Sequence, residues 1–81
     1  MTSSRELKSI RSRIRDVPDF PKRGIMFKDI TPVLSDVNTL RASVKEMAAP
    51  FMSLGIDVVV GIESRGFIFG APIADTLNCS F

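Results

Sequence analysis

The chain has 81 residues, a formal net charge of +2, 44% hydrophobic residues and 25% charged residues, which is ordinary for a soluble globular protein and excludes a disordered or low-complexity chain. A single cysteine and the absence of histidine exclude an intrachain disulfide, a His/Cys zinc site and a catalytic Ser-His or Cys-His pair. No apolar run approaches the ~20 residues that cross a membrane, so we expect one small cytoplasmic domain without a membrane partner.

An amphipathic helix is predicted over residues 4–15. Ser3 and Glu6 fit a capping box at its start. Apolar residues then follow at one-face helical spacing, namely Leu7, Ile10 and Ile14. The other face is basic, because the first 28 residues carry eight Lys/Arg against three acids. Nucleic-acid contact is one interpretation of this face, but we favour a solvated helix face and expect no nucleic-acid partner.

Prolines end this first helix. Pro18 and Pro21 disfavour helical backbone, so residues 16–24 are predicted to form an extended, turn-rich connector. Residues 25–30 follow as a short, partly alternating run, and we interpret them as an irregular strand or loop.

A second helix is predicted over residues 38–54, with Asp36 or Asn38 as its cap. Its apolar residues share one face, namely Leu40, Val44, Met47, Phe51 and Leu54. Pro50 lies inside this pattern, so we expect either a kink one turn earlier or a new helical turn that begins at Pro50.

Residues 57–62 form an apolar run without helical or alternating pattern, which predicts a buried parallel strand covered on both faces. A loop over residues 63–66 and a third helix over residues 67–77 follow, and Pro72 predicts an irregular or kinked first turn in that helix. Strand, loop and helix in this order are the first part of a right-handed βαβ unit, whose second strand would begin after Asn78.

The loop after the predicted strand reads Glu63-Ser64-Arg65-Gly66. Ligands bind beyond the carboxyl ends of the strands in open parallel sheets. Arg65 offers a bidentate clamp for an anion there, and Gly66 lets backbone amides approach a ligand closely. We therefore predict an anionic substrate; the alternative is a strand-end turn in which an exposed Arg65 pairs with Glu63.

The segment Ile25-Met26-Phe27-Lys28-Asp29 is a second candidate for binding. Taken alone it is better explained as a piece of core, with Phe27 buried and Lys28 paired to Asp29. A planar aromatic ligand, stacked on Phe27 and read at its edge by backbone groups, is the alternative.

Three motifs occur here in one order and spacing: PDFP at residues 18–21, GIMFKDITP at 24–32 and GIESRGFIFGAP at 61–72. Together they closely resemble the N-terminal half of the adenine phosphoribosyltransferase family, and the resemblance covers the chain from about Ile10 to Cys79. It implies the α/β fold of a type I phosphoribosyltransferase, a doubly wound and mostly parallel sheet, here ending after the first core strand and its helix.

The resemblance also implies a reaction and its binding residues. The family converts adenine and 5-phosphoribosyl diphosphate to AMP and diphosphate in purine salvage, with Mg²⁺, as a homodimer. The residues that it implies for adenine are Met26, Phe27 and Lys28, with Phe27 stacking and its neighbours bonding through the backbone. Those that it implies for the diphosphate of the ribosyl donor are Glu63, Ser64, Arg65 and Gly66, with a non-proline cis bond between the first two.

Departures from the family pattern limit what this chain is expected to do. Arg23 stands where the family usually has a proline, which should loosen the turn before Met26. The family's ribose 5-phosphate signature, flexible hood and catalytic glutamate would lie beyond residue 81, so we expect no catalytic residue, no metal ligand and no activity from this stretch alone. A non-catalytic short product that associates with full-length subunits is the alternative.

Overall fold

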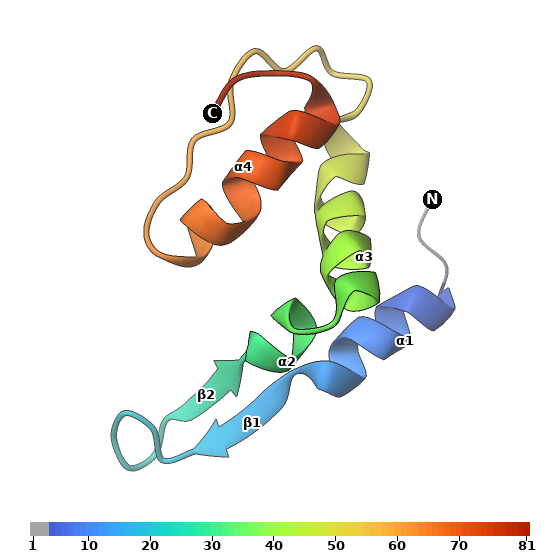
Figure 1. Ribbon diagram of the computed structural model, residues 1–81. Helices are drawn as coiled ribbons and strands as arrows, with labels where there is room; N and C mark the ends of the chain where they lie inside the picture. Colours follow the sequence, from blue (N-terminus) through green and yellow to red (C-terminus); the bar gives the residue numbers. More distant parts are fainter. Residues whose placement is uncertain (1–3) are drawn as a thin grey trace. The chain divides into compact units, whose positions relative to one another are not determined.

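A computed structural model describes residues 4–81, which form two compact units that meet in sequence between Ala42 and Ser43 (Figure 1). Helix α3, Val37–Ala48, runs across this point in the sequence, and each unit is described here by itself. Within residues 4–81, no helix has the length and apolar character needed to cross a membrane.

The N-terminal unit begins with α1, Ser4–Arg13, so the helix predicted over residues 4–15 ends two residues earlier than expected. Ser3, the predicted capping residue, lies outside the described residues. Arg15 belongs instead to strand β1, Arg15–Pro18, where it pairs with Asp29. The prediction was wrong at this end because the pairing of two strands distant in sequence outweighs the local helical pattern.

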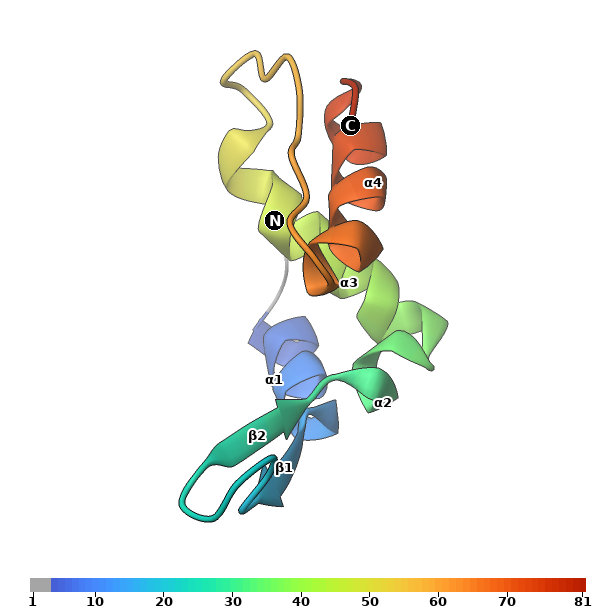
Figure 2. The same ribbon diagram turned by 90° about the vertical axis from the view of Figure 1, so that its left-hand side faces the viewer.

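Strand β1 pairs antiparallel with β2, Met26–Asp29, and both views show the two strands side by side (Figures 1 and 2). The register places Asp16 opposite Lys28 and Val17 opposite Phe27. The extended conformation predicted for residues 16–18 is confirmed, but their pairing as a strand was not foreseen. Proline is compatible with this strand because, in a sheet of two strands, every strand is an edge.

The β1–β2 connection is a closed loop. The backbone amide of Phe20 donates to the carbonyl of Ile25 at 3.0 Å, and that of Gly24 donates to the Asp19 carboxylate at 2.8 Å. The Phe20–Pro21 bond is cis, and Asp19 and Gly24 both have positive φ values, 55° and 86°. The predicted turn-rich character of this part of the connector is thus confirmed.

Substitutions at Arg23 and Gly24 are expected to change stability in opposite directions. Ile25 donates to the carbonyl of Lys22 at 3.2 Å, so Arg23 takes the second position of a four-residue turn, which favours proline. Arg23→Pro should raise the free energy of unfolding by about 0.4–1 kcal/mol. Gly24→Ala should lower it by about 1–2 kcal/mol, from backbone conformation alone because a Cβ meets no atom within 4 Å. Urea unfolding of both variants tests the pair, and a stable Gly24→Ala chain would contradict it.

Helix α2, Thr31–Leu34, leads into α3. The carboxylate of Asp36 accepts a hydrogen bond from the amide of Asn38 at 2.8 Å, so of the two predicted caps it is Asp36 that performs the role. The hydroxyl of buried Thr39 donates to the carbonyl of Val33 at 2.7 Å, which ties α3 to α2.

The C-terminal unit contains the end of α3, a 3-10 turn over Ala49–Phe51, and α4, Arg65–Leu77. The predicted second helix therefore ends at Ala48 rather than at residue 54. A separate turn begins at Ala49 with Pro50 as its second residue, so the second of the two expected outcomes holds to within one residue. Proline has no amide hydrogen to donate and is well suited to the first turn of a helical segment.

The strand predicted over residues 57–62 is extended backbone with a single parallel bridge, between Val58 and Ser80. The amide of Val59 donates to the carbonyl of Ser80 at 2.9 Å. Val60 and Ile62 are 79% and 77% exposed, so the prediction of a strand covered on both faces is wrong for the described residues. A strand needs neighbours on its edges and faces, and residues 4–81 supply only one short neighbour.

Helix α4 starts at Arg65, two residues before the predicted start, and ends at Leu77 as predicted. Asn78 closes it in the left-handed conformation, with φ of 58°, and the next amide, of Cys79, donates to the carbonyl of Ala74 at 3.0 Å. Pro72 is accommodated within the helix.

Candidate functional site

The three residues predicted to contact adenine lie together on β2. Met26 is 52% exposed, whereas Phe27 is half-buried and packs edge-to-face against Phe20, with ring centroids 5.2 Å apart and planes at 70°. Sequence reasoning did not foresee Phe20 as the neighbour of Phe27. Contact with Phe20 holds the ring of Phe27 on β2, which within residues 4–81 pairs with another strand along one edge.

The charged partners in this hairpin differ from those expected. Lys28 donates to the carboxylate of Asp16, the residue opposite it in the register. The interpretation of residues 25–29 as core paired Lys28 with Asp29, whereas the structure shows Lys28 paired with Asp16 and Asp29 paired with Arg15. Cross-strand opposition brings Lys28 and Asp16 together, while neighbours along a strand point to opposite faces.

Asp29 ends β2 with its carboxylate largely enclosed, its residue being 9% exposed. Arg15 donates to this carboxylate from Nε at 3.0 Å and from a terminal nitrogen at 2.7 Å. Thr31 donates to it from its amide at 3.0 Å and from its hydroxyl at 2.8 Å. Four hydrogen bonds thus satisfy a buried charge, and the two bonds from Thr31, followed by Arg15, lower the pKa of Asp29 below its ordinary value.

The lowered pKa of Asp29 predicts an acid-sensitive hairpin. A carboxyl group whose pKa is lower in the folded state stabilises that state fully above its ordinary value, 3.8, and the contribution is lost as pH falls through the lowered value. Urea unfolding at a series of pH values should therefore show stability falling below pH 3.8. Asp29→Asn should be less stable than wild type above pH 3.8. Below this pH its free energy of unfolding should depend less steeply on pH than that of wild type, and an equally steep dependence would contradict the assignment.

The residues predicted to contact diphosphate lie together in the C-terminal unit, Glu63 and Ser64 directly before α4 and Arg65 and Gly66 in its first turn. The Glu63–Ser64 bond is cis, which confirms the bond that the resemblance implied. Arg65 is the first residue of α4, and the amide of Phe67 donates back to the carbonyl of Ser64 at 3.1 Å. Glu63, Ser64 and Arg65 are exposed. A guanidinium beside the first amides of a 13-residue helix is an arrangement that favours an anion.

Close backbone packing fixes this loop. A Cβ added to Gly66 would lie 3.2 Å from the backbone of Gly61, and a Cβ added to Gly61 would lie 2.6 Å from the carbonyl oxygen of Gly66. The two glycines therefore allow the segment before the loop and the start of α4 to approach each other.

The predicted site residues fall into these two clusters, Met26–Lys28 in the N-terminal unit and residues 63–66 in the C-terminal unit. Among residues 4–81, no group of three or more His, Cys, Asp or Glu side chains lies together as a metal site would require.

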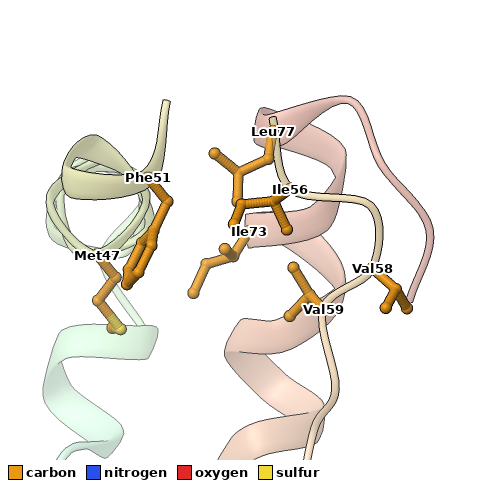
Figure 3. A pocket seen from close by; sticks show the side chains of 7 residues that line it. All are labelled: Met47, Phe51, Ile56, Val58, Val59, Ile73 and Leu77. Atoms are coloured by element: carbon orange, nitrogen blue, oxygen red, sulfur yellow. The ribbon is translucent and has the colours of Figure 1, made fainter. Parts of the chain in front are cut away.

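An apolar pocket of about 480 Å³ lies in the C-terminal unit and was not foreseen from the sequence (Figure 3). Figure 3 shows side chains from α3 and the 3-10 turn, from the extended segment and from α4 pointing into it. The lining residues are Met47, Phe51, Ile56, Val58, Val59, Ile73 and Leu77. With no charged or hydrogen-bonding side chain in this lining, the pocket does not suit an anion.

No family model matches the chain. Solved structures nevertheless define its class, because the elements described above are those of the N-terminal part of a type I phosphoribosyltransferase fold. The adenine phosphoribosyltransferase of Rhodothermus marinus matches with a TM-score of 0.89 at 47% identity, covering 98% of this chain and 45% of that one. The Saccharomyces cerevisiae enzyme matches with a TM-score of 0.86 at 28% identity, covering 98% and 47%. The α/β fold class predicted from the sequence is confirmed.

Curated relatives are similar to this chain over most of its length. The adenine phosphoribosyltransferase of Anaeromyxobacter dehalogenans (strain 2CP-C) is 58% identical over 73 residues, which is 90% of this chain and 42% of the relative. That of Myxococcus xanthus is 49% identical over 81 residues, 100% of this chain and 44% of the relative. The predicted resemblance is confirmed: in sequence and in fold the chain is similar to the N-terminal part of adenine phosphoribosyltransferases, and it spans less than half of their length.

Proposed function

We propose that this chain is the N-terminal portion of an adenine phosphoribosyltransferase, which converts adenine and 5-phosphoribosyl diphosphate to AMP and diphosphate in purine salvage. The observation that carries the proposal is the match to the Rhodothermus marinus structure, at a TM-score of 0.89 and 47% identity over 98% of this chain. The Saccharomyces cerevisiae structure was solved with adenine, and that from Giardia lamblia with 9-deazaadenine, which supports a purine as the substrate.

In this proposal β2 binds the purine. Phe27 stacks on the base, because its ring is held by Phe20 and lies on a strand that, in the part of the chain the structure describes, pairs along one edge. Met26 and Lys28 contribute backbone groups that read the edge of the base. The side chain of Lys28 donates to Asp16, so the proposal assigns the purine contact of this residue to its backbone.

The loop at residues 63–66 binds the diphosphate of the ribosyl donor. Arg65 pairs with phosphate oxygens, and the first amides of α4 donate to the same anion. Ser64 adds a hydroxyl, Gly66 allows close approach of the backbone, and Glu63 completes the loop. These groups would stabilise the negative charge that develops on the departing diphosphate. In this way they would assist displacement at the anomeric carbon of the ribose.

We propose that Mg²⁺ reaches the site on the donor. Mg²⁺ commonly keeps several waters and is bound through substrate phosphates together with one or two carboxylates. Bound there, the ion would neutralise charge on the leaving diphosphate. The whole protein is proposed to act in the cytoplasm as a homodimer.

Binding to the 81-residue chain tests these assignments residue by residue. Adenine should shift the backbone amide NMR signals of Met26, Phe27 and Lys28, and inorganic diphosphate should shift those of residues 63–66. The chain by itself should form no AMP from adenine and 5-phosphoribosyl diphosphate. Adenine that shifts the loop signals and leaves β2 unchanged would overturn the assignment.

A second proposal, association with subunits of full length, is favoured by one observation. Val58, Val60 and Ile62 alternate along the extended segment and are 51%, 79% and 77% exposed, which leaves an apolar stripe uncovered. A pull-down of the Rhodothermus marinus enzyme by this chain tests the idea. Capture that persists equally when Val60 and Ile62 are both replaced by Lys would exclude this stripe as the contact.

A further inference from the structure

We propose that Asp29 is a positioning residue for the purine: its carboxylate fixes the end of β2 and thereby the orientation of Phe27 and of the backbone at Met26 and Lys28. This inference rests on the proposed function. Asp29 itself points its carboxylate to Arg15 and Thr31 and has no assigned contact with a substrate.

The first step of the argument is the place of Asp29 in the chain. It follows Lys28 directly, is the last residue of β2, and is paired in register with Arg15, the first residue of β1. The strand pair has only four register positions, so fixing its last pair restrains the three before it. A one-residue slip in this pairing would turn Phe27 to the opposite face of the sheet.

The second step is the set of bonds that this one carboxylate makes. Its two oxygens receive four hydrogen bonds at 2.7–3.0 Å, two from Arg15 on the neighbouring strand and two from Thr31 at the start of α2. The Asp29 side chain is 12% exposed, whereas that of Asp16, which pairs with Lys28 across the hairpin, is 57% exposed. A charge that is enclosed and bonded in this way holds its partners far more strictly than a solvated ion pair.

The third step is the opposite end of the segment. There the hairpin loop is closed by the bonds from Phe20 to Ile25 and from Gly24 to Asp19. Residues 26–28 thus lie between a closed loop and the Asp29 cluster. Loss of the hydrogen bonds to Asp29 would leave the hairpin loop closed but would let β2 change its register or twist.

The experiment compares adenine with inorganic diphosphate on the 81-residue chain. Asp29→Asn should weaken adenine binding about tenfold or more, because it removes the charge from four hydrogen bonds. Diphosphate binding at residues 63–66 should change less than twofold, which a general loss of folding would not allow. Asp16→Asn, which removes the same charge from an exposed position of the same hairpin, is the matched control and should keep adenine affinity within about twofold.

Thr31 supplies variants that retain the fold if Asp29→Asn does not. Thr31→Val removes one bond to the carboxylate and should weaken adenine binding severalfold, while Thr31→Ser keeps the hydroxyl and should restore it. Amide hydrogen exchange at residues 26–28 should be faster in Asp29→Asn and in Thr31→Val than in wild type. Wild-type adenine affinity in these variants, or unchanged exchange, would overturn the inference. Failure of the wild-type chain to bind adenine would instead overturn the proposed function, and the exchange rates would still decide the role of Asp29.

Discussion

Replacing Arg65 with Ala is expected to raise the KM for 5-phosphoribosyl diphosphate by about 10–100-fold and to change the KM for adenine by less than about threefold. The measurement uses a chimaera of residues 1–81 of this chain and the C-terminal part of the Rhodothermus marinus enzyme. That enzyme is chosen because its match covers 98% of this chain. The magnitude follows from losing charge-assisted hydrogen bonds to an anion, each worth about 1.5–3 kcal/mol.

The split between the two KM values is what distinguishes a role in donor binding from a role in folding. Arg41→Ala is the control, because it removes the same charge from an exposed position on α3. It should leave both KM values near those of the unmodified chimaera. Equal losses for adenine and donor in Arg65→Ala would contradict the assignment of Arg65 to diphosphate.

The second large effect is expected at Gly61. A Cβ there would lie 2.6 Å from the carbonyl oxygen of Gly66 and 2.7 Å from the ring of Phe81. The carbonyl belongs to the backbone at the start of α4 and cannot move alone, so Gly61→Ala should lower the free energy of unfolding by about 1–3 kcal/mol. Far-UV circular dichroism in urea measures this, since the chain has no Trp or Tyr for fluorescence.

Gly70→Ala provides the matched comparison. A Cβ at Gly70 would lie 2.3 Å from the Phe81 ring, and its three nearest atoms all belong to that side chain. The ring can rotate away, and alanine gains about 1 kcal/mol over glycine inside a helix, so the net change should be small. Phe81→Ala should relieve any remaining cost at Gly70 and should fail to rescue Gly61→Ala. Full rescue at Gly61 would show that the backbone contact does not limit this position.

Helices were predicted well where local signals decide them. Asp36 at the start of α3, the break at Pro50 and the end of α4 at Leu77 all depend on residues within one turn of the feature. The end of α1 was predicted two residues too late because Arg15 pairs with Asp29, and such a pairing leaves no mark on the local pattern.

Strands were predicted less well for the same physical reason. The apolar run at residues 57–62 has the composition of a buried strand, yet it has one bridge, to Ser80, and exposed side chains at Val60 and Ile62. Apolar composition records which residues suit burial, whereas burial itself requires neighbouring strands and helices.

For the candidate site, too, the residues that the motifs contain were predicted, whereas the residues that support them were not. Motif spacing predicted Met26–Lys28 and residues 63–66 as the site. The structure places the first group on β2 and the second at the start of α4, with Glu63 and Ser64 before the helix and Arg65 and Gly66 within it. The supporting residues were missed. Phe20 beside Phe27, and Arg15 with Thr31 around Asp29, come from positions whose proximity is created by the hairpin and the turn into α2.

The central claim is that residues 1–81 are a working N-terminal portion of an adenine phosphoribosyltransferase. Turnover by the chimaera with the Rhodothermus marinus enzyme tests it most directly, with circular dichroism as the check that the chimaera is folded. The account predicts AMP formation from adenine and 5-phosphoribosyl diphosphate, lost when either substrate is omitted. A folded chimaera that forms no AMP, although the parent enzyme does under the same conditions, would contradict it.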